Sequence, residues 1–264
     1  MFKIEKALNR VKLNESSQEE AITSAEVELS ETPEPSYRQT KIVLPSEPHL
    51  ERHRVLGFLD DPRFVDYYNM LRTQVLDKTR PKGHNTIMMT SVADGEGTTL
   101  TSINLAVSIA KEVKQTVLLV DTDLRNPTIH KYLGYNPKEG LSDYLVGDLS
   151  LSELLINPGI DKLVVLLGGQ PVPGSTEILG SPKMEALVQE MKHRYPDRYV
   201  IFDCPSVLDS ADALVFSAHV DGIILVVESG STPRERIRKA VDLLKDRNLL
   251  GSVMNKAKEL PHIA

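Results

Sequence analysis

The sequence predicts an α/β fold in which helices cover both faces of a doubly wound, mostly parallel sheet. Short apolar runs lie at 86–90, 116–121, 162–167, 199–203, 222–227 and 251–254, and helical stretches separate them at 100–113, 181–194, 211–218 and 233–246. The runs are apolar throughout, which is typical of strands that are covered on both faces. Strands that alternate with helices in this way favour parallel pairing.

Composition narrows the class of protein. The chain has 264 residues, of which 41% are hydrophobic and 26% charged, enough for one domain of about 200 residues with appendages. A formal net charge of −6 argues against nucleic acid as a partner. The single cysteine, Cys204, excludes an internal disulfide and fits a reducing cytosol. No apolar run approaches the roughly 18 residues of a membrane span, and the start lacks a signal-peptide core. We therefore expect a cytoplasmic protein.

Three regions are expected along the chain. Residues 1–13 form a short amphipathic segment with apolar residues at helical spacing. Residues 14–60 are an acidic linker rich in Glu, Ser, Thr and Pro, which we expect to be disordered because few large apolar side chains offset the ordering entropy. Residues 61–264 are the folded domain, which opens with Asp61 and Pro62 at a helix start. An apolar stripe extends that helix to Lys78.

A glycine-containing loop follows the first strand of the domain. Residues 91–99 read SVADGEGTT and lie between an apolar strand and an apolar helix, as a phosphate-binding loop does. Gly95 and Gly97 can adopt the positive φ of such a loop, and Thr99 can bind a metal at the helix start. A phosphate-binding loop also carries a lysine for the β- and γ-phosphates, and this loop has none. Nucleotide binding is therefore predicted, and phosphoryl transfer is left open.

Aspartates follow two of the predicted strands. Asp121 and Asp123 come after the apolar residues 117–120, and Asp203 follows 199–202. Ligands of open α/β sheets bind at the carboxyl ends of the strands. One such aspartate is often a plain turn former. Two strand-end sites together with the glycine loop favour a Mg²⁺ site.

At these residues the sequence resembles a known family. The segment from Gly95 to Thr99 is similar to a first Walker motif, residues 118–127 to the family's second motif, and 200–205 to its Walker B motif. The family is that of the bacterial tyrosine kinases that accompany capsule and exopolysaccharide assembly, a branch of the P-loop ATPases related to the cell-division and plasmid-partition ATPases. The resemblance extends from about Asp66 to Lys256 and implies a nucleotide-binding domain of the P-loop NTPase type over 61–264.

The resemblance implies roles for individual residues with ATP and Mg²⁺ as cofactors. The residues implied to bind the nucleotide are Gly95, Glu96, Gly97, Thr98, Thr99, Leu100, Arg125 and Asn255. Those implied for the metal are Thr99, Asp121 and Asp203, and the catalytic carboxylates are Asp121, Asp123 and Asp203. Two alternatives remain open: Arg125 braces Asp123 instead of reaching a phosphate, and Asn255 is a strand-end turn former instead of an adenine contact.

The chain departs from the family at several positions. The family has a lysine at the position of Thr98, and its partition-type relatives have another at Ala93, while Asp94 and Glu96 bring negative charge near the phosphates. No tyrosine follows Asn255, where the family carries its autophosphorylation cluster. The family's oligomer-forming helix carries Glu-x-x-Arg-x-x-Arg, and the matching positions here are Asp66, Asn69 and Arg72.

The resemblance implies a nucleotide-binding protein similar to a cytoplasmic protein-tyrosine kinase that regulates exopolysaccharide or capsule polymerisation and export. The departures imply weakened or partner-dependent phosphotransfer. The expected partner is a membrane polysaccharide co-polymerase, a chain-length regulator, which would hold the chain at the periphery of the inner membrane. A homo-oligomer is also expected, and nucleic acid is not. Two alternatives are a catalytically inactive regulatory partner of the co-polymerase and a slow ATPase switch of the partition type.

Overall fold

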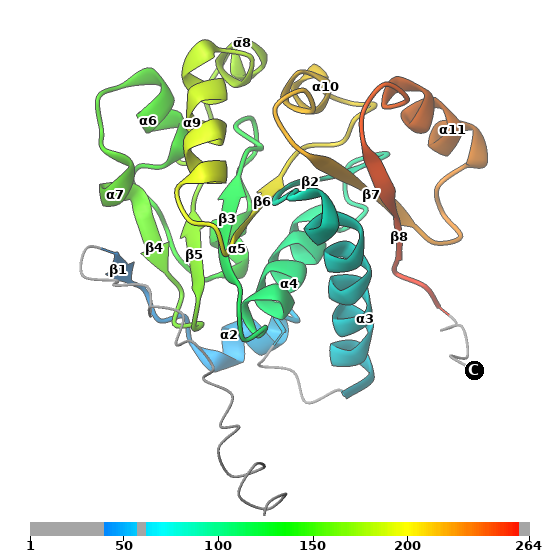
Figure 1. Cartoon of the computed structure of the whole chain (residues 1–264), viewed down its shortest axis with the longest axis horizontal. Helices are drawn as coiled ribbons and strands as arrows, with labels where there is room; N and C mark the ends of the chain where they lie inside the picture. The colour runs from blue at the N-terminus through cyan, green and yellow to red at the C-terminus, as the bar shows by residue number, and fades with distance from the viewer. Residues whose placement is uncertain (1–39, 57–61, 259–264) are drawn as a thin grey trace, which may run out of the picture. The chain divides into compact units, whose positions relative to one another are not determined.

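The computed structural model describes residues 40–56 and 62–258. They form an eight-stranded sheet with the order β1-β4-β5-β3-β6-β2-β7-β8 (Figure 1). The strands are β1 (Lys41–Ile42), β2 (Thr86–Ser91), β3 (Thr116–Asp121), β4 (Leu155–Asn157), β5 (Leu163–Leu166), β6 (Arg198–Asp203), β7 (Gly222–Glu228) and β8 (Leu249–Asn255).

The predicted fold class is confirmed. Each pair of neighbouring strands is parallel except β4 and β5, which pair antiparallel. The six predicted strands correspond to β2, β3, β5, β6, β7 and β8. The sequence did not indicate β1 and β4, since strands of two and three residues carry too short an apolar run to be recognised.

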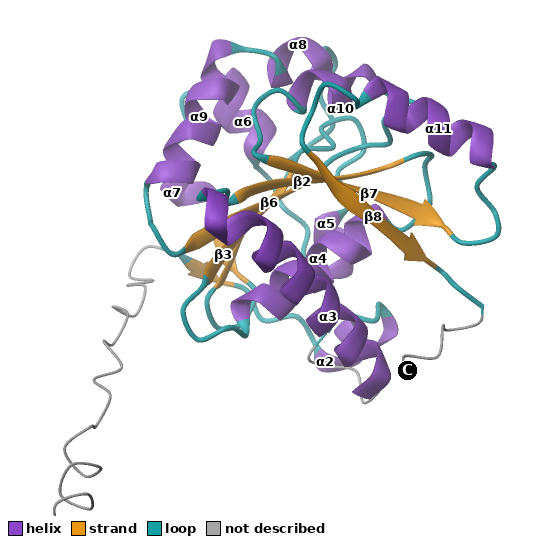
Figure 2. Cartoon of the chain, turned by 45° about the vertical axis from the view of Figure 1, so that its right-hand side comes forward, coloured by secondary structure: helices purple, strands orange, loops and turns teal. Residues whose placement is uncertain are grey.

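Helices lie on both sides of the sheet (Figure 2). Helices whose buried residues join one core cluster are α2 (Glu47–Arg52), α3 (Pro62–Thr79), α4 (Thr98–Ala110) and α5 (Ile129–Tyr132). Those that join the other cluster are α6 (Leu141–Val146), α7 (Leu151–Leu154), α8 (Ser175–Leu179), α9 (Pro182–His193), α10 (Ala211–Phe216) and α11 (Arg234–Leu243). One 3₁₀ turn, η1 (Arg80–Lys82), follows α3.

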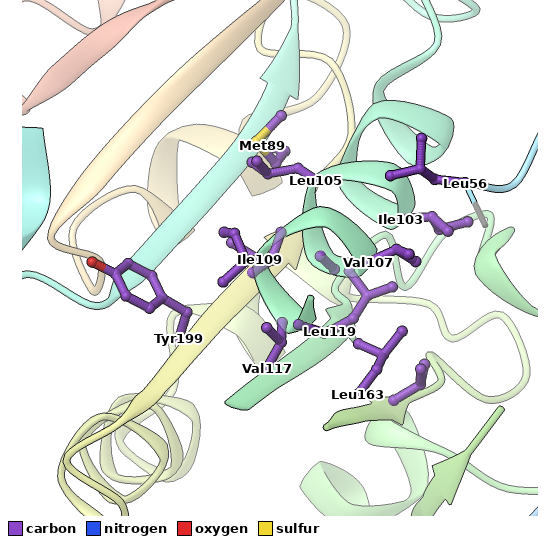
Figure 3. Close-up of a cluster of buried hydrophobic side chains, with 14 of the residues drawn as sticks. Leu56, Met89, Ile103, Leu105, Val107, Ile109, Val117, Leu119, Leu163 and Tyr199 are labelled. Atoms are coloured by element: carbon purple, nitrogen blue, oxygen red, sulfur yellow. The ribbon is translucent and has the colours of Figure 1, made fainter. Parts of the chain in front are cut away.

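Successive residues of a strand point to opposite faces of the sheet, so they belong to different core clusters. Ile87 and Met89 of β2 belong to the cluster under α4, whereas Met88 between them belongs to the cluster on the other face. Figure 3 shows the first cluster, in which α4 side chains such as Leu105 and Ile109 meet residues of the sheet. This packing fixes the start of α4 against the end of β2, where the glycine loop lies.

The folded part begins earlier than residue 61. Within the stretch expected to be linker, Lys41–Ile42 forms β1 and Glu47–Arg52 forms α2. Leu50, Val55 and Leu56 are buried in the cluster under α4. Buried Asn104 of α4 accepts a hydrogen bond from the Leu56 N–H at 2.8 Å and donates one to the Arg54 carbonyl at 3.0 Å. Composition missed this segment because it has few large apolar residues; of these, Leu50, Val55 and Leu56 are buried, while Ile42 and Leu44 are exposed.

The expected amphipathic segment at 1–13 and linker residues 14–39 lie outside the described part of the chain. Among the residues that are described, no helix is long and apolar enough to cross a membrane.

Candidate functional site

The glycine loop connects β2 to α4 and has the backbone that its sequence predicts. Gly95 and Gly97 have φ values of 80° and 92°, which favour glycine. Gly97 is required for a second reason, since a Cβ there would lie 2.2 Å from Nδ2 of Asn255. Asn255 ends β8 and donates from Nδ2 to the Glu96 carbonyl at 2.8 Å. The end of β8 therefore holds the glycine loop in place.

The side chain of Glu96 lies inside the protein. Its Oε2 accepts a hydrogen bond from the Val92 N–H at 2.9 Å, and its Oε1 accepts one from the Thr232 hydroxyl. These bonds turn the carboxylate into the loop, and its negative charge stays close to the predicted phosphate position. Asp94 differs, since its Oδ1 accepts from Ser206 at 2.6 Å while its N–H donates to Asp209 at 3.2 Å.

Two predicted carboxylates meet at the carboxyl ends of β3 and β6. Asp121 and Asp203 are directly paired in the sheet register, and both are buried. Burial and the nearby charge of Asp203 raise the pKa of Asp121 well above its usual value. Burial raises the pKa of Asp203 to about 7, although hydrogen bonds from Thr99 and Ser102 oppose the shift. Two carboxylates this close favour a cation beside them.

The residues at this edge fit Mg²⁺ held jointly with phosphates. Ser102 Oγ lies 2.9 Å from Oδ1 of Asp203, and Thr99 Oγ1 lies 3.0 Å from Oγ1 of Thr128. No group of three or more His, Cys, Asp or Glu in the described ranges is arranged to hold a metal by itself. Mg²⁺ commonly takes one or two carboxylates together with waters and substrate phosphates. Hydroxyl and carboxylate oxygens beside a glycine loop match that need.

The remaining carboxyl oxygens near this edge organise the following turn. Oδ2 of Asp121 accepts the N–H groups of Thr128 and Ile129 at 2.9 and 3.0 Å. Asp123 accepts the N–H of Asn126 at 3.0 Å and is only partly buried, and burial raises its pKa. Asp123 is therefore more accessible than Asp121 to a reacting group. Thr98 is buried at the start of α4, and Leu100 is half-buried.

Arg125 binds a carboxylate that the sequence did not single out. Its Nε and Nη2 donate to the two carboxylate oxygens of Asp212, each at 3.0 Å. Hydroxyls of Ser175 and Thr176 also bind Asp212. Burial opposes ionisation of Asp212, but the bonds from Arg125 and the two hydroxyls outweigh it and lower the pKa. Arg125 thus braces Asp212 in this structure, where Asp123 was the expected partner, and its contact with a phosphate stays a prediction.

Lys256 is a residue that the sequence reasoning missed. It follows Asn255 directly, and its Nζ donates to the Gly95 carbonyl at 2.7 Å and to Oε2 of Glu228 at 2.8 Å. The loop that lacks a lysine in its own sequence therefore has one bound to it from the end of β8. A signal was available, because ligands of parallel sheets bind where strands end and Lys256 stands at such an end.

Comparison with known proteins identifies the family. No family model matches the chain. Tyrosine-protein kinase YwqD of Bacillus subtilis (strain 168) is 35% identical to it over 199 residues, which are 75% of this chain and 83% of that protein. The chain belongs to the bacterial tyrosine-protein kinase family.

Solved structures agree with this membership. The chimerical protein CapA2B2 superposes with a TM-score of 0.71 and 26% identity over 83% of this chain and 94% of that chain. The kinase domain of the Escherichia coli tyrosine kinase ETK gives a TM-score of 0.68 and 28% identity, and the match covers 74% of this chain and 78% of that chain. The fold and family predicted from the Walker-like motifs are confirmed, while the roles of the individual site residues remain predictions.

Proposed function

We propose that this kinase-family member binds ATP with Mg²⁺ and transfers the γ-phosphate to a tyrosine hydroxyl of a protein. The observation that supports the proposal is the meeting of the glycine loop, Thr99 and the Asp121–Asp203 pair at one edge of the sheet. Phosphoryl transfer depends on positioning and on stabilising charge, and these groups serve both needs.

Each group has a distinct task in this proposal. The loop N–H groups and the start of α4 bind phosphate oxygens. Thr99, Asp121 and Asp203 hold the metal, and Mg²⁺ when bound neutralises charge on the β- and γ-phosphates. The bond from the γ-phosphorus to the bridging oxygen breaks as a bond to the tyrosine oxygen forms. Asp123, the least buried of the three aspartates, accepts the hydroxyl proton.

Activity should be weakened by the missing lysine at position 98. Loss of one charge-stabilising donor typically costs about 10²–10³ in rate. Slow or partner-dependent turnover is therefore the expected behaviour. The same observation favours one other function, a regulatory partner that binds nucleotide without turnover.

The decisive experiment uses the full chain. Calorimetry with Mg·ATP measures binding, and mass spectrometry follows γ-phosphate transfer to an added tyrosine peptide. We expect Mg²⁺-dependent binding with slow transfer, and Thr98→Lys should raise transfer about ten-fold or more. Asp203→Asn should weaken the metal-dependent part of the affinity. Asp161→Asn is the matched control, because Asp161 is exposed just before β5.

The outcomes separate the functions. No binding at millimolar ATP would contradict nucleotide binding altogether. Binding without transfer, in both the wild type and Thr98→Lys, would favour the regulatory function. Hydrolysis without transfer to tyrosine would favour the slow ATPase switch.

Family membership also supports a role in exopolysaccharide or capsule polymerisation and export, at the cytoplasmic side of the inner membrane. We propose a membrane polysaccharide co-polymerase as the partner. Crosslinking of the full chain to the co-polymerase in cells is the direct test, and deletion of the gene should change polysaccharide amount or chain length. Unchanged polysaccharide would contradict this role while leaving the kinase proposal standing.

Self-association is a separate proposal. Of the positions that match the family's oligomer-forming helix, Arg72 is already engaged within the chain: it donates to the Ser108 carbonyl at 2.9 Å and lies 3.5 Å from Glu112. An oligomer would therefore need other contacts of α3. Light scattering of the full chain with and without Mg·ATP measures the state.

A further inference from the structure

The ammonium of Lys256 lies at the glycine loop and has two partners. Its ammonium binds the carbonyl of Gly95 inside the glycine loop and the carboxylate of Glu228 at the end of β7. Its side chain is 47% exposed and that of Glu228 is 29% exposed. A surface ion pair of this kind contributes little to stability. Stability alone therefore does not explain why Lys256 lies at the loop. A role in binding the phosphates at the loop explains it better.

The backbone at Lys256 is held in an uncommon conformation. Its φ is 55°, in the left-handed region, which costs a non-glycine residue roughly 1–2 kcal/mol. Such strain persists only where neighbouring contacts fix it. Here the Ser229 N–H donates to the Asn255 carbonyl at 2.8 Å, and Asn255 is itself bound to the loop. These contacts turn the chain at the end of β8, beside Gly95.

The charge at the loop is otherwise unfavourable for phosphate. Residues 91–99 contain no lysine or arginine; Asp94 belongs to the loop, and Asp209 lies beside it. Arg236 also lies near the loop, but it is paired with Asp209 at 3.2 Å and not with the loop backbone. Within residues 40–56 and 62–258, Lys256 is the cation that lies on the loop backbone itself. Four rotatable bonds let its ammonium exchange a neutral carbonyl or Glu228 for a phosphate oxygen.

We propose that the Lys256 ammonium binds the phosphates of the nucleotide and supplies, from the end of the last strand, the positive charge that position 98 lacks. This rests on the proposed nucleotide binding. Lys256 releases Glu228 when the phosphates arrive, because a multiply charged phosphate chain attracts an ammonium more strongly than one carboxylate does. Its effect is larger for ATP than for ADP, since ATP carries the additional charged phosphate.

The first test is Lys256→Gln in the full chain, with affinities for Mg·ATP and Mg·ADP measured by calorimetry. Glutamine keeps a donor for the Gly95 carbonyl and removes the charge. ATP affinity should fall about ten-fold or more, with a smaller fall for ADP. Lys256→Arg should stay within about three-fold of the wild type, because it keeps the charge.

A matched control exists at the other end of α4. Lys162 also has a positive φ, 59°, and its Nζ also donates to backbone carbonyls, those of Glu112 and Val113 at 3.2 and 3.3 Å. Lys162→Gln removes the same kind of contact away from the loop. Its ATP affinity should match that of the wild type.

Glu228→Gln tests the opposite direction. If the Lys256–Glu228 pair merely braces the end of the sheet, this change weakens nucleotide binding. If Lys256 serves the phosphates, the change removes a competitor and raises ATP affinity by about two- to three-fold. Thr98→Lys in the Lys256→Gln background should recover most of the lost ATP affinity, since one ammonium replaces the other.

Each outcome has one meaning. A wild type that binds no nucleotide overturns the proposed function, and this inference with it. A wild type that binds ATP, with Lys256→Gln binding it equally well, overturns this inference alone. Equal losses for ATP and ADP in both Lys256→Gln and Lys256→Arg, accompanied by a lower unfolding temperature, also overturn it, because they identify a structural tether.

Discussion

Asp203 is a buried carboxyl group. Without a bound metal, the hydrogen bonds to its charged form compensate only part of the cost of burying that charge. Its ordinary pKa of 3.8 rises to about 7 in the folded chain, mainly through burial. Between these values the folded state holds the proton more tightly than the unfolded state does. The site therefore contributes stability at low pH that is lost as the pH rises through about 7. A cation bound beside Asp121 and Asp203 would restore it.

Asp203→Asn should consequently stabilise the metal-free protein at pH 8 while weakening Mg²⁺-dependent nucleotide binding. The amide keeps an acceptor for Ser102 and removes the charge beside Asp121. We expect a gain on the order of 1–2 kcal/mol at pH 8 that shrinks towards pH 5. Urea unfolding at the two pH values measures it, with Asp161→Asn as control. Equal destabilisation at both pH values would show that the charge of Asp203 is already well compensated.

Gly97 and Gly95 allow steric crowding to be separated from backbone strain. Both have positive φ, so alanine costs each roughly 1–2 kcal/mol. Only at Gly97 would the new Cβ also collide with Asn255, because nothing lies within 4 Å of a Cβ at Gly95. We expect Gly97→Ala to be the more destabilising in urea unfolding and to lose ATP binding. Equal costs for the two variants would mean that Asn255 moves aside freely.

At the scale of elements, Arg125 joins the turn after β3 to α8 and α10. It binds Ser175 and Thr176 at the start of α8 and Asp212 in the first turn of α10. Asp212 is fully buried while Arg125 is half-exposed. The buried carboxylate depends on this cation, so the contact fixes how the two short helices sit at the carboxyl edge of the sheet.

Arg125→Ala should therefore destabilise the fold by roughly 1–3 kcal/mol, the cost of leaving a buried polar group short of a partner. Lysine should not restore it, because lysine lacks the paired donors that bind both oxygens. Nucleotide affinity measured by calorimetry should change little at a temperature where the variant is folded. A stable variant with poor ATP affinity would support the phosphate-binding role that the family resemblance implies.

Helix α2 gives a second prediction at this scale. Leu50 is buried in the cluster under α4, although it lies where composition indicated linker. Leu50→Ala should cost about 2–5 kcal/mol in urea unfolding, as for other core leucines. Glu51→Ala, on an exposed position of the same helix, should stay within about 0.5 kcal/mol of the wild type. If Leu50→Ala left the free energy of unfolding unchanged, this segment would be part of the linker and not of the core.

At the scale of the whole molecule, the site is assembled from strands that are distant in the sequence. Asn255 binds the loop after β2 across 159 positions, and Asp203 pairs with Asp121 across the β3–β6 ladder. A ligand that touches the loop and these aspartates therefore links the middle of the sheet to its last strand. Binding should stabilise the fold as a unit.

Mg·ADP at about 100 times its dissociation constant should accordingly raise the free energy of unfolding by about 2.7 kcal/mol. For a domain of this size, the unfolding temperature should rise by roughly 5–10 °C. Differential scanning calorimetry measures the shift, and Gly97→Ala with the same ligand is the control without a working loop. Independent transitions, with only one of them shifted, would show that the strands do not unfold together.

The sequence by itself determined the parallel sheet, the positions of six strands, the glycine loop and the strand-end aspartates. These features are local: an apolar run covered on both faces, a glycine with positive φ and a residue that ends a strand each leave a signature within a few positions. The family resemblance rested on the same local signatures.

Only the tertiary structure decided which residues meet. In the folded chain Lys256 binds the Gly95 carbonyl, and Arg125 binds Asp212. The carboxylate of Glu96 turns into the loop. It also placed Leu50 in the core. These contacts join segments that parallel pairing brings together from far along the chain, and the identity of a lysine, an aspartate or a leucine does not specify its distant partner. The missing lysine was therefore readable from the sequence, whereas the lysine that lies beside the loop was not.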